Sequence, residues 1–254
     1  MDRPANDSRS IRYSRLRSML DATATVLVIV ASLAVITLVA SLWQRSHNEP
    51  PEVANGTDAS VPKEPQPLGG AAKLGDDAAR VASVQFADFE CVFCAQFARD
   101  TWPAIRTNYI ASGQVLAIFR HLPLANHRYA RSAAVSAACA GLQGKFWQMH
   151  DRLYLAQPQL SHDTGRSLAV GLGLDPAAFN ECSESALDSV ESDLSLARDV
   201  GISSTPAFLI GIVQPDQTLK TTHIILRAQP LARFEAVFHE LLGKRSRNSW
   251  FGLR

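Results

Sequence analysis

The 254-residue sequence predicts a mixed α/β domain that follows one membrane-spanning helix. Three observations lead to this prediction: an uncharged apolar run near the N-terminus, a Pro-rich stretch after it, and then alternating strand-like and helical segments. With 46% hydrophobic residues, the chain can bury a sizeable core. A net charge of +1 argues against a dedicated nucleic-acid-binding protein, so we expect no nucleic-acid partner.

The apolar run covers residues 22–44 and contains no charged side chain. As a helix rising 1.5 Å per residue, a run of this length spans roughly the 30 Å hydrocarbon core of a bilayer. Five arginines in residues 1–21 place this first segment in the cytoplasm and the rest of the chain outside. A cleaved signal peptide is the alternative, but the length of the run favours an uncleaved anchor.

Residues 45–74 follow the anchor, contain five prolines and no aromatic residue, and predict a flexible linker. We expect the folded domain over residues 75–243, with a basic tail at 244–254.

Within this domain the order of elements is strand, helix, strand, a helical block, a strand pair and a helix. The helical block, at about 125–200, is an insertion between a βαβ unit and a hairpin-plus-helix unit. Asp175 before Pro176 predicts a helix start inside it. The expected strands are 81–86, 114–120, 207–212 and 221–226, and the expected flanking helices are 91–112, interrupted near Pro103, and 231–242.

Two cysteines, Cys91 and Cys94, stand where the first strand gives way to a helix. The free N–H groups and the dipole at a helix N-terminus stabilise an anion, so a thiol there can fall from about 8.5 to a pKa of roughly 3.5–7.5. One helical turn brings Cys94 back against Cys91. The pattern therefore predicts a reactive dithiol, with Cys91 as the attacking and leaving sulfur and Cys94 as the resolving thiol.

A second signal is Thr205-Pro206, directly before an apolar strand. An X-Pro bond at the head of a strand is a candidate cis bond. It would leave the Thr205 backbone free to pair with an extended substrate peptide. Neither signal is specific alone, but together, each in its strand context, they predict one site.

These residues resemble the DsbA-like branch of the thioredoxin superfamily, over roughly Ala79 to Leu242. The resemblance implies a thioredoxin fold with an inserted α-helical domain, thiol–disulfide exchange at Cys91/Cys94, and a cis-proline at Pro206. It lies in residues 86–94 (FADFECVFC), 119–124 (FRHLPL), 138–140 (ACA), 144–151 (GKFWQMHD) and 201–211 (GISSTPAFLIG).

The sequence departs from the family pattern between the two cysteines. Val92 stands where members often carry Pro, and Phe93 stands where the strongest oxidants carry His. Without that His, we expect Cys91 to depend mainly on the helix terminus for ionisation, with Asp88 and Glu90 opposing it. A less acidic Cys91 gives a less oxidising disulfide. The resemblance therefore supports the class of reaction more firmly than its direction.

Cys139 and Cys182 both fall in the inserted helical region. They could be two buried free thiols or a structural disulfide, and the resemblance favours the disulfide. A zinc site is not expected, because only one C-x-x-C pair is present. We predict no metal and no cofactor.

Together these observations predict a single-pass protein of the cytoplasmic (inner) membrane, with an outward-facing thiol:disulfide oxidoreductase domain. Its partners would be exported proteins with thiols or disulfides and a membrane redox partner, quinone-linked by family analogy, that recycles the pair. Two alternatives stay open: a reductase, for example for cytochrome maturation, and a non-catalytic chaperone or copper-binding module, since soft thiolates favour Cu(I).

Overall fold

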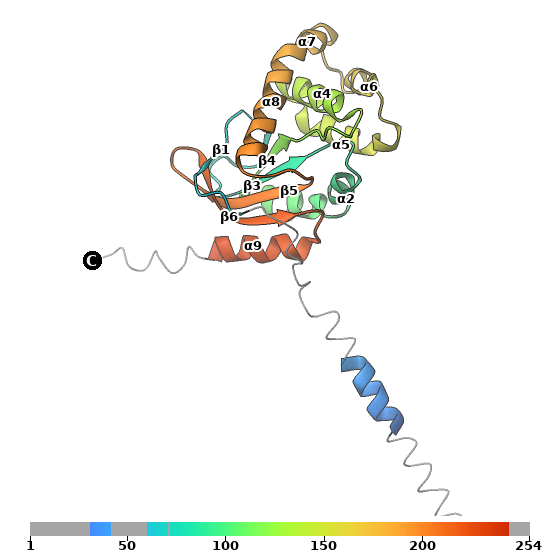
Figure 1. Ribbon diagram of the computed structural model, residues 1–254, viewed down its shortest axis with the longest axis vertical. Helices are drawn as coiled ribbons and strands as arrows, with labels where there is room; N and C mark the ends of the chain where they lie inside the picture. The colour runs from blue at the N-terminus through green and yellow to red at the C-terminus, as the bar shows by residue number, and fades with distance from the viewer. Residues whose placement is uncertain (1–30, 42–59, 71, 244–254) are drawn as a thin grey trace, which may run out of the picture. The chain divides into compact units, whose positions relative to one another are not determined.

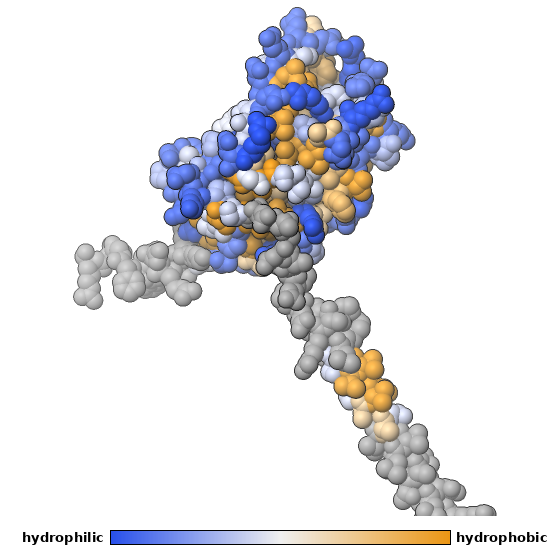
Figure 2. All heavy atoms as spheres, viewed as in Figure 1, coloured by the Kyte–Doolittle hydropathy of each residue, from blue (hydrophilic) through white to orange (hydrophobic). Residues whose placement is uncertain are grey.

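The computed structural model describes residues 31–41, 60–70 and 72–243. Residues 31–41 form a helix whose large apolar side chains are exposed, and Figure 2 shows it as mostly hydrophobic. Within the described ranges, no helix combines the length and the apolar character that crossing a bilayer requires. The predicted anchor at 22–44 lies partly outside the described residues and stays a prediction. The predicted segments 1–21 and 244–254 lie outside the described residues.

A six-stranded sheet, in the order β1-β6-β5-β3-β4-β2, forms the centre of the folded domain (Figure 1). The neighbours β3 and β4 are parallel, whereas β5 runs antiparallel to β3, and β6 runs antiparallel to β5. The strands are β1 (Gln66–Pro67), β2 (Ala72–Leu74), β3 (Val81–Ala87), β4 (Val115–His121), β5 (Ala207–Val213) and β6 (Thr218–Leu226). The four predicted strands are present, and β3 and β4 are buried along their whole length.

The predicted linker at 45–74 is wrong in its second half, because β1 and β2 are the two edge strands of the sheet. Leu68, between them, is fully buried in the core beneath β3 and β4. The guanidinium of Arg120 also donates to the carbonyls of Pro67 (2.7 Å) and Gly69 (2.8 Å). The folded domain therefore begins before residue 75, because burial of Leu68 and these bonds hold the segment on the sheet.

One face of the sheet packs against helices α2, α3 and α9 and the π-helical segment η1. Phe97, Phe208 and Phe234 meet in this core, with ring centroids 4.6–5.4 Å apart. The elements are α2 (Val92–Asp100), α3 (Trp102–Ile105), η1 (Arg106–Ile110) and α9 (Leu231–Gly243). The expected interruption near Pro103 lies at Thr101, since Pro103 is the second residue of α3, where a missing N–H costs least.

The helical insertion covers the other side of the domain (Figure 1). It comprises α4 (Ala130–Leu142), α5 (Phe146–Leu155), the short 3₁₀ turn η2 (Gln157–Gln159), α6 (Thr164–Gly171), α7 (Pro176–Glu181) and α8 (Ser183–Asp199). Asp175 caps α7 by accepting from the N–H of Ala178 at 2.7 Å, which confirms the predicted helix start. A disulfide joins Cys139 in α4 to Cys182 before α8, with the Cα atoms 5.7 Å apart.

A buried ion pair joins the insertion to the sheet. The Asp193 carboxylate, on α8, accepts from the Arg120 guanidinium and from the backbone N–H of His121, both at 2.8 Å. Both side chains of the pair are almost completely buried. The hydrophobic core of the insertion also includes Cys91 and Cys94, so the cysteine pair lies where the sheet meets the inserted helices.

Candidate active site

Cys91 is the N-cap residue of α2, directly after the loop that leaves β3. Its backbone is extended (φ −72°, ψ 118°), and its carbonyl accepts the first helical hydrogen bond from Ala95 at 3.1 Å. The Cys91 sulfur therefore stands beside the free N–H groups of the first turn, as the sequence predicts.

The two cysteines are free thiols, and both are buried: Cys91 is 6% exposed and Cys94 is not exposed. The two residues between them are exposed to solvent: Val92 is 71% exposed and Phe93 is 59% exposed. Two large apolar side chains thus project into solvent directly beside the sulfur pair. These two side chains are available for contact with an apolar group that approaches Cys91.

The two thiols differ strongly in acidity. A hydrogen bond from the Cys94 thiol lowers the pKa of Cys91 from 9.0 to about 6, against the opposing effect of burial, and the backbone N–H groups of Cys94 and Phe93 add to the lowering. Burial raises the pKa of Cys94 well above 9.0, and the neighbouring Cys91 raises it further. At neutral pH the reduced pair therefore holds one thiolate, on Cys91, and one thiol, on Cys94.

This corrects the expected source of Cys91 acidity. The helix terminus contributes, but the largest contribution comes from Cys94. The expected opposition from Asp88 and Glu90 is not among the causes of the shift. Both carboxylates are occupied by hydrogen bonds to backbone N–H groups, from Leu124 to Asp88 (2.8 Å) and from Tyr129 to Glu90 (2.6 Å).

The segment before β5 lies against Cys91. The Thr205–Pro206 peptide bond is cis, and both residues are buried. In its protonated form the Cys91 thiol donates to the carbonyl oxygen of Thr205 at 3.4 Å, across 114 residues of sequence. The structure thus brings together Cys91, Cys94, Thr205 and Pro206. Cys139 and Cys182 form a disulfide in the insertion and are not part of this group.

The loop between β3 and α2 is fixed by a buried carboxylate that the sequence did not single out for this role. Asp88 accepts from the backbone N–H of Glu90 (2.7 Å) and of Leu124 (2.8 Å), and from Nδ1 of His127 (2.7 Å). These bonds tie the loop to the segment that follows β4. In the sequence, the only indication of this role is an acidic residue two positions before a turn, and acidic residues in turns are common.

Tyr154, near the end of α5, and Gln157, in η2, contact the other side of the loop between β3 and α2. The Gln157 amide donates to the carbonyls of Phe89 (2.8 Å) and Cys91 (2.9 Å). Burial raises the pKa of Tyr154 well above its usual value, and its hydroxyl donates to the Asp88 carbonyl at 3.5 Å. The sequence did not predict these roles of Tyr154 and Gln157, because no local pattern indicates a contact with residues more than 60 positions away.

Among the residues that the structure describes, no three or more His, Cys, Asp or Glu side chains gather in a way that could hold a metal ion.

A sequence profile described as "Thioredoxin" matches residues 69–225, more than half of the chain. The chain belongs to this thioredoxin family. The matched range begins before residue 75 and includes β2, and it contains the Cys91/Cys94 pair and the Thr205–Pro206 bond.

Solved structures of thioredoxin-family proteins have the same fold. Alpha-DsbA1 of Wolbachia pipientis is 26% identical, with a TM-score of 0.60 over 70% of this chain and 94% of its own. BdbD of Bacillus subtilis, in its oxidised form, is 22% identical, with a TM-score of 0.63 over 74% of this chain and 100% of its own. A periplasmic thioredoxin-like protein of Salmonella enterica is 24% identical, with a TM-score of 0.57 over 68% of this chain and 91% of its own. The chain is a DsbA-like thiol:disulfide oxidoreductase, as the sequence predicts.

Curated relatives include Na(+)/H(+) antiporters. The chain is 35% identical over 139 residues to antiporter NhaA 3 of Salinispora tropica, and 31% identical over 138 residues to NhaA of Herminiimonas arsenicoxydans. Each match covers 54% of this chain but only 21% of the antiporter. The similarity thus concerns about a fifth of those proteins.

Proposed function

We propose that this thioredoxin-family protein donates disulfides to exported proteins outside the cytoplasm, through Cys91 and Cys94. The observation that carries the proposal is the opposite shift of the two thiols: the pKa of Cys91 falls to about 6 while that of Cys94 rises. A dithiol with one stabilised thiolate next to one retained thiol is the reduced product of such a donation.

The first step starts from the disulfide form of the pair. A substrate thiolate attacks Cys91 Sγ, the Cys91–Cys94 bond breaks, and its electron pair leaves on Cys94 Sγ. The high pKa of Cys94 means that this sulfur takes up a proton and becomes a thiol. The extended substrate would pair with the backbone of Thr205, beside Pro206, which holds the mixed disulfide against Cys91.

In the second step, another substrate thiolate attacks the substrate sulfur of the mixed disulfide. The bond to Cys91 breaks, and Cys91 leaves as a thiolate, which its low pKa favours. The substrate has lost two electrons and gained a disulfide, and the pair has gained two electrons. A membrane redox partner, quinone-linked by family analogy, would accept these two electrons and restore the disulfide.

The pKa of about 6 for Cys91 lies between the values of roughly 7 for thioredoxin and roughly 3.5 for DsbA, so the direction of exchange is set by the reduction potential. A thiolate that is stabilised in the reduced protein makes the disulfide form more oxidising, since reduction then releases the better leaving group. The reductase alternative requires the reverse, a reduced pair that readily gives up its electrons. The copper-binding alternative would use the same two sulfurs, but Cys94 would have to lose its proton.

The proposed location is the cytoplasmic membrane, with the domain facing the periplasm or exterior. The basic residues before the apolar run at 22–44 support this orientation. The Salmonella protein of the same fold is described as periplasmic, which agrees with it. The segment at 45–59 would tether the domain to the anchor.

Two variants and one potential test the proposal. We expect Cys91→Ser to abolish oxidation of a reduced dithiol peptide and Cys94→Ser to accumulate mixed disulfides that are visible on a non-reducing gel. Equilibration with glutathione decides the direction, because a potential near about −120 mV, the value of a strong oxidase, supports donation, whereas thioredoxin has about −270 mV. A value near −270 mV would favour the reductase. Full activity of Cys91→Ser would refute the exchange mechanism.

A further inference from the structure

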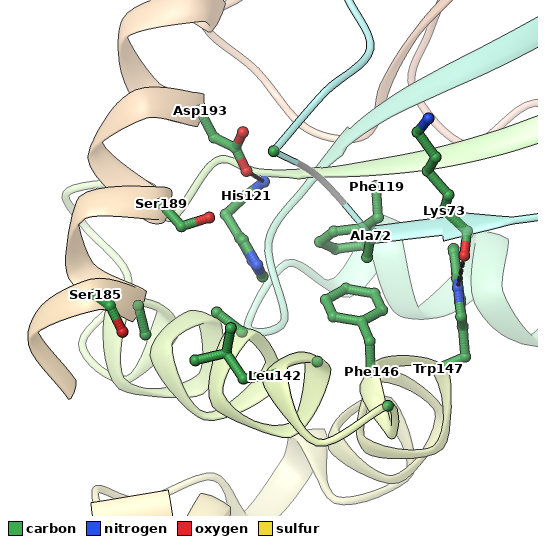
Figure 3. A pocket seen from close by; sticks show the side chains of 15 residues that line it. Ala72, Lys73, Phe119, His121, Leu142, Phe146, Trp147, Ser185, Ser189 and Asp193 are labelled. Atoms are coloured by element: carbon green, nitrogen blue, oxygen red, sulfur yellow. Dashed lines mark hydrogen bonds between the residues drawn. The ribbon is translucent and has the colours of Figure 1, made fainter. Parts of the chain in front are cut away.

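A cavity of about 480 Å³ lies between the β2–β4 edge of the sheet and helices α4, α5 and α8 (Figure 3). Neither redox cysteine lines it. Its volume is within the range of sites for small organic ligands. The site already described does not use this space.

One wall of the cavity is aromatic. Phe119, Phe146 and Trp147 line it, and their ring centroids lie 5.2–6.4 Å from one another. The Trp147 indole is held by a hydrogen bond from Nε1 to the carbonyl of Lys73 at 2.8 Å. These rings therefore present fixed apolar surface for a flat, apolar body.

The opposite wall is polar and comes from α8. Ser185, Ser189 and Asp193 follow one another at intervals of four residues, which places them on one face of the helix. Figure 3 shows this face beside the cavity. The Ser185 hydroxyl donates to its own helix, at the carbonyl of Cys182, whereas the Ser189 hydroxyl makes no hydrogen bond within the described chain.

The polar centre of the cavity is His121. Its imidazole lines the space, is only 4% exposed, and carries an Nδ1 without a hydrogen-bond partner among the described residues. Burial lowers the pKa of His121 to about 3, helped by the charge of Arg120, so the ring is neutral and holds one donor and one acceptor.

Every formal charge that lines the cavity is already compensated. Asp193 is paired with Arg120, and Lys73 with Asp77. A charged ligand would enter without a counterion, which is costly in a partly buried site. The cavity therefore suits a neutral molecule with one group that both donates and accepts.

We infer that this cavity binds a neutral aromatic alcohol of the phenol or naphthol class. The ring of the ligand would lie against Phe119, Phe146 and Trp147, and its hydroxyl would bond to His121 and Ser189. The ligand would lie behind the redox site rather than in it. Phe119 would lie between the ligand and the redox site. Its ring stacks on that of Phe89, with the centroids 5.4 Å apart, and Phe89 precedes Cys91 by two residues.

The test uses the full chain in detergent and two fluorinated probes, 6-fluoro-2-naphthol and 2-fluoronaphthalene, which differ by the hydroxyl. Binding is followed by ¹⁹F NMR, with a detergent-only titration subtracted. We expect the naphthol to bind about tenfold more tightly than the naphthalene. His121→Phe should remove this difference, because it keeps a ring of similar size but no nitrogen.

Filling the cavity locates the binding site. Ser189→Leu should weaken naphthol binding at least tenfold, and Ser185→Leu serves in its place if the first variant does not fold. The matched control is Ser192→Leu, an exposed α8 position that does not line the cavity and should bind like the unaltered protein. Equal affinity for both probes, no binding of the naphthol, or unchanged binding in a filled and folded variant would each overturn the inference.

Discussion

Nδ1 of His127 lies 2.7 Å from the buried carboxylate of Asp88, across 39 residues of sequence. The same carboxylate accepts two backbone N–H groups, so it ties the loop before Cys91 to the segment after β4. Asp88 is therefore a positioning residue for the redox pair. Its contribution is to hold the backbone from which the first sulfur projects.

We expect Asp88→Asn to lower the free energy of unfolding by about 2 kcal/mol, because an amide cannot accept all three of these bonds with a full charge. Exchange with a dithiol peptide should also slow. Urea unfolding and the exchange rate check both effects. Asp188→Asn, at an exposed position of α8, is the control and should change neither. An Asp88→Asn protein as stable as the control would show that the network adds little.

The pH dependence of Cys91 follows from its pKa of about 6. The rate of Cys91 alkylation by iodoacetamide in the reduced protein should rise with pH to a midpoint near 6 and then level off. Cys94 should stay unreactive over the same range, because burial raises its pKa. Cys94→Ala should move the midpoint upward, towards 9.0, since the Cys94 thiol is the largest cause of the lowering. An unmoved midpoint would instead make the helix terminus the main cause.

The same shift links pH to the stability of the reduced protein. Between pH 6 and 9 the folded protein holds Cys91 as a thiolate while the unfolded chain holds it as a thiol. The free energy of unfolding of the reduced form should therefore rise over this window, and the contribution should be absent below pH 6. Cys91→Ala should remove this part of the pH dependence. Urea unfolding at a series of pH values, in the presence of reductant, measures it.

The Cys139–Cys182 bond closes 43 residues of the insertion and lies apart from the redox pair. Replacing both cysteines with alanine should cost roughly 4 kcal/mol of stability on the chain-entropy account. The reduction potential of Cys91/Cys94 should not change. Thermal unfolding and glutathione equilibration separate the two effects, and a shifted potential would mean that this disulfide also takes part in exchange.

The Arg120–Asp193 pair joins β4 to α8 in the interior. Asp193→Ala should cost about 3–5 kcal/mol, because it leaves a buried guanidinium without its counterion. The Arg120→Met, Asp193→Leu double variant should cost a comparable amount, because it also leaves the carbonyls of Pro67 and Gly69 and the N–H of His121 without their partners. On the same helix, Glu191 pairs with Arg131 at the surface, and Glu191→Ala should cost no more than about 1 kcal/mol. Urea unfolding of the three proteins checks the order, and equal costs for the buried and surface pairs would contradict it.

The central strands and flanking helices could be predicted because their signals are local. Strand β5 is a continuous apolar run, and Asp175 before Pro176 marks a helix start within two residues. The relation of Cys91 to the start of α2 is equally local, since it depends on one strand ending and one helix beginning.

What the sequence could not predict depends on contacts across the fold. Strands β1 and β2 are two and three residues long in a Pro-rich segment, and only the burial of Leu68 and the carbonyl contacts of Arg120 place them on the sheet. Gln157 reaches the redox loop from 66 residues away. No pattern of neighbouring residues reports such a contact.

The exposed Val92 and Phe93 beside a buried sulfur pair have a consequence for timing. A client must bring a flexible chain to Cys91, and it gains contact with these two side chains only if it still displays apolar residues near its thiol. A folded client offers neither a flexible chain nor exposed apolar residues near its thiol. For the proposed disulfide donation, we therefore expect an unfolded dithiol substrate to be oxidised faster than the same substrate once it has folded.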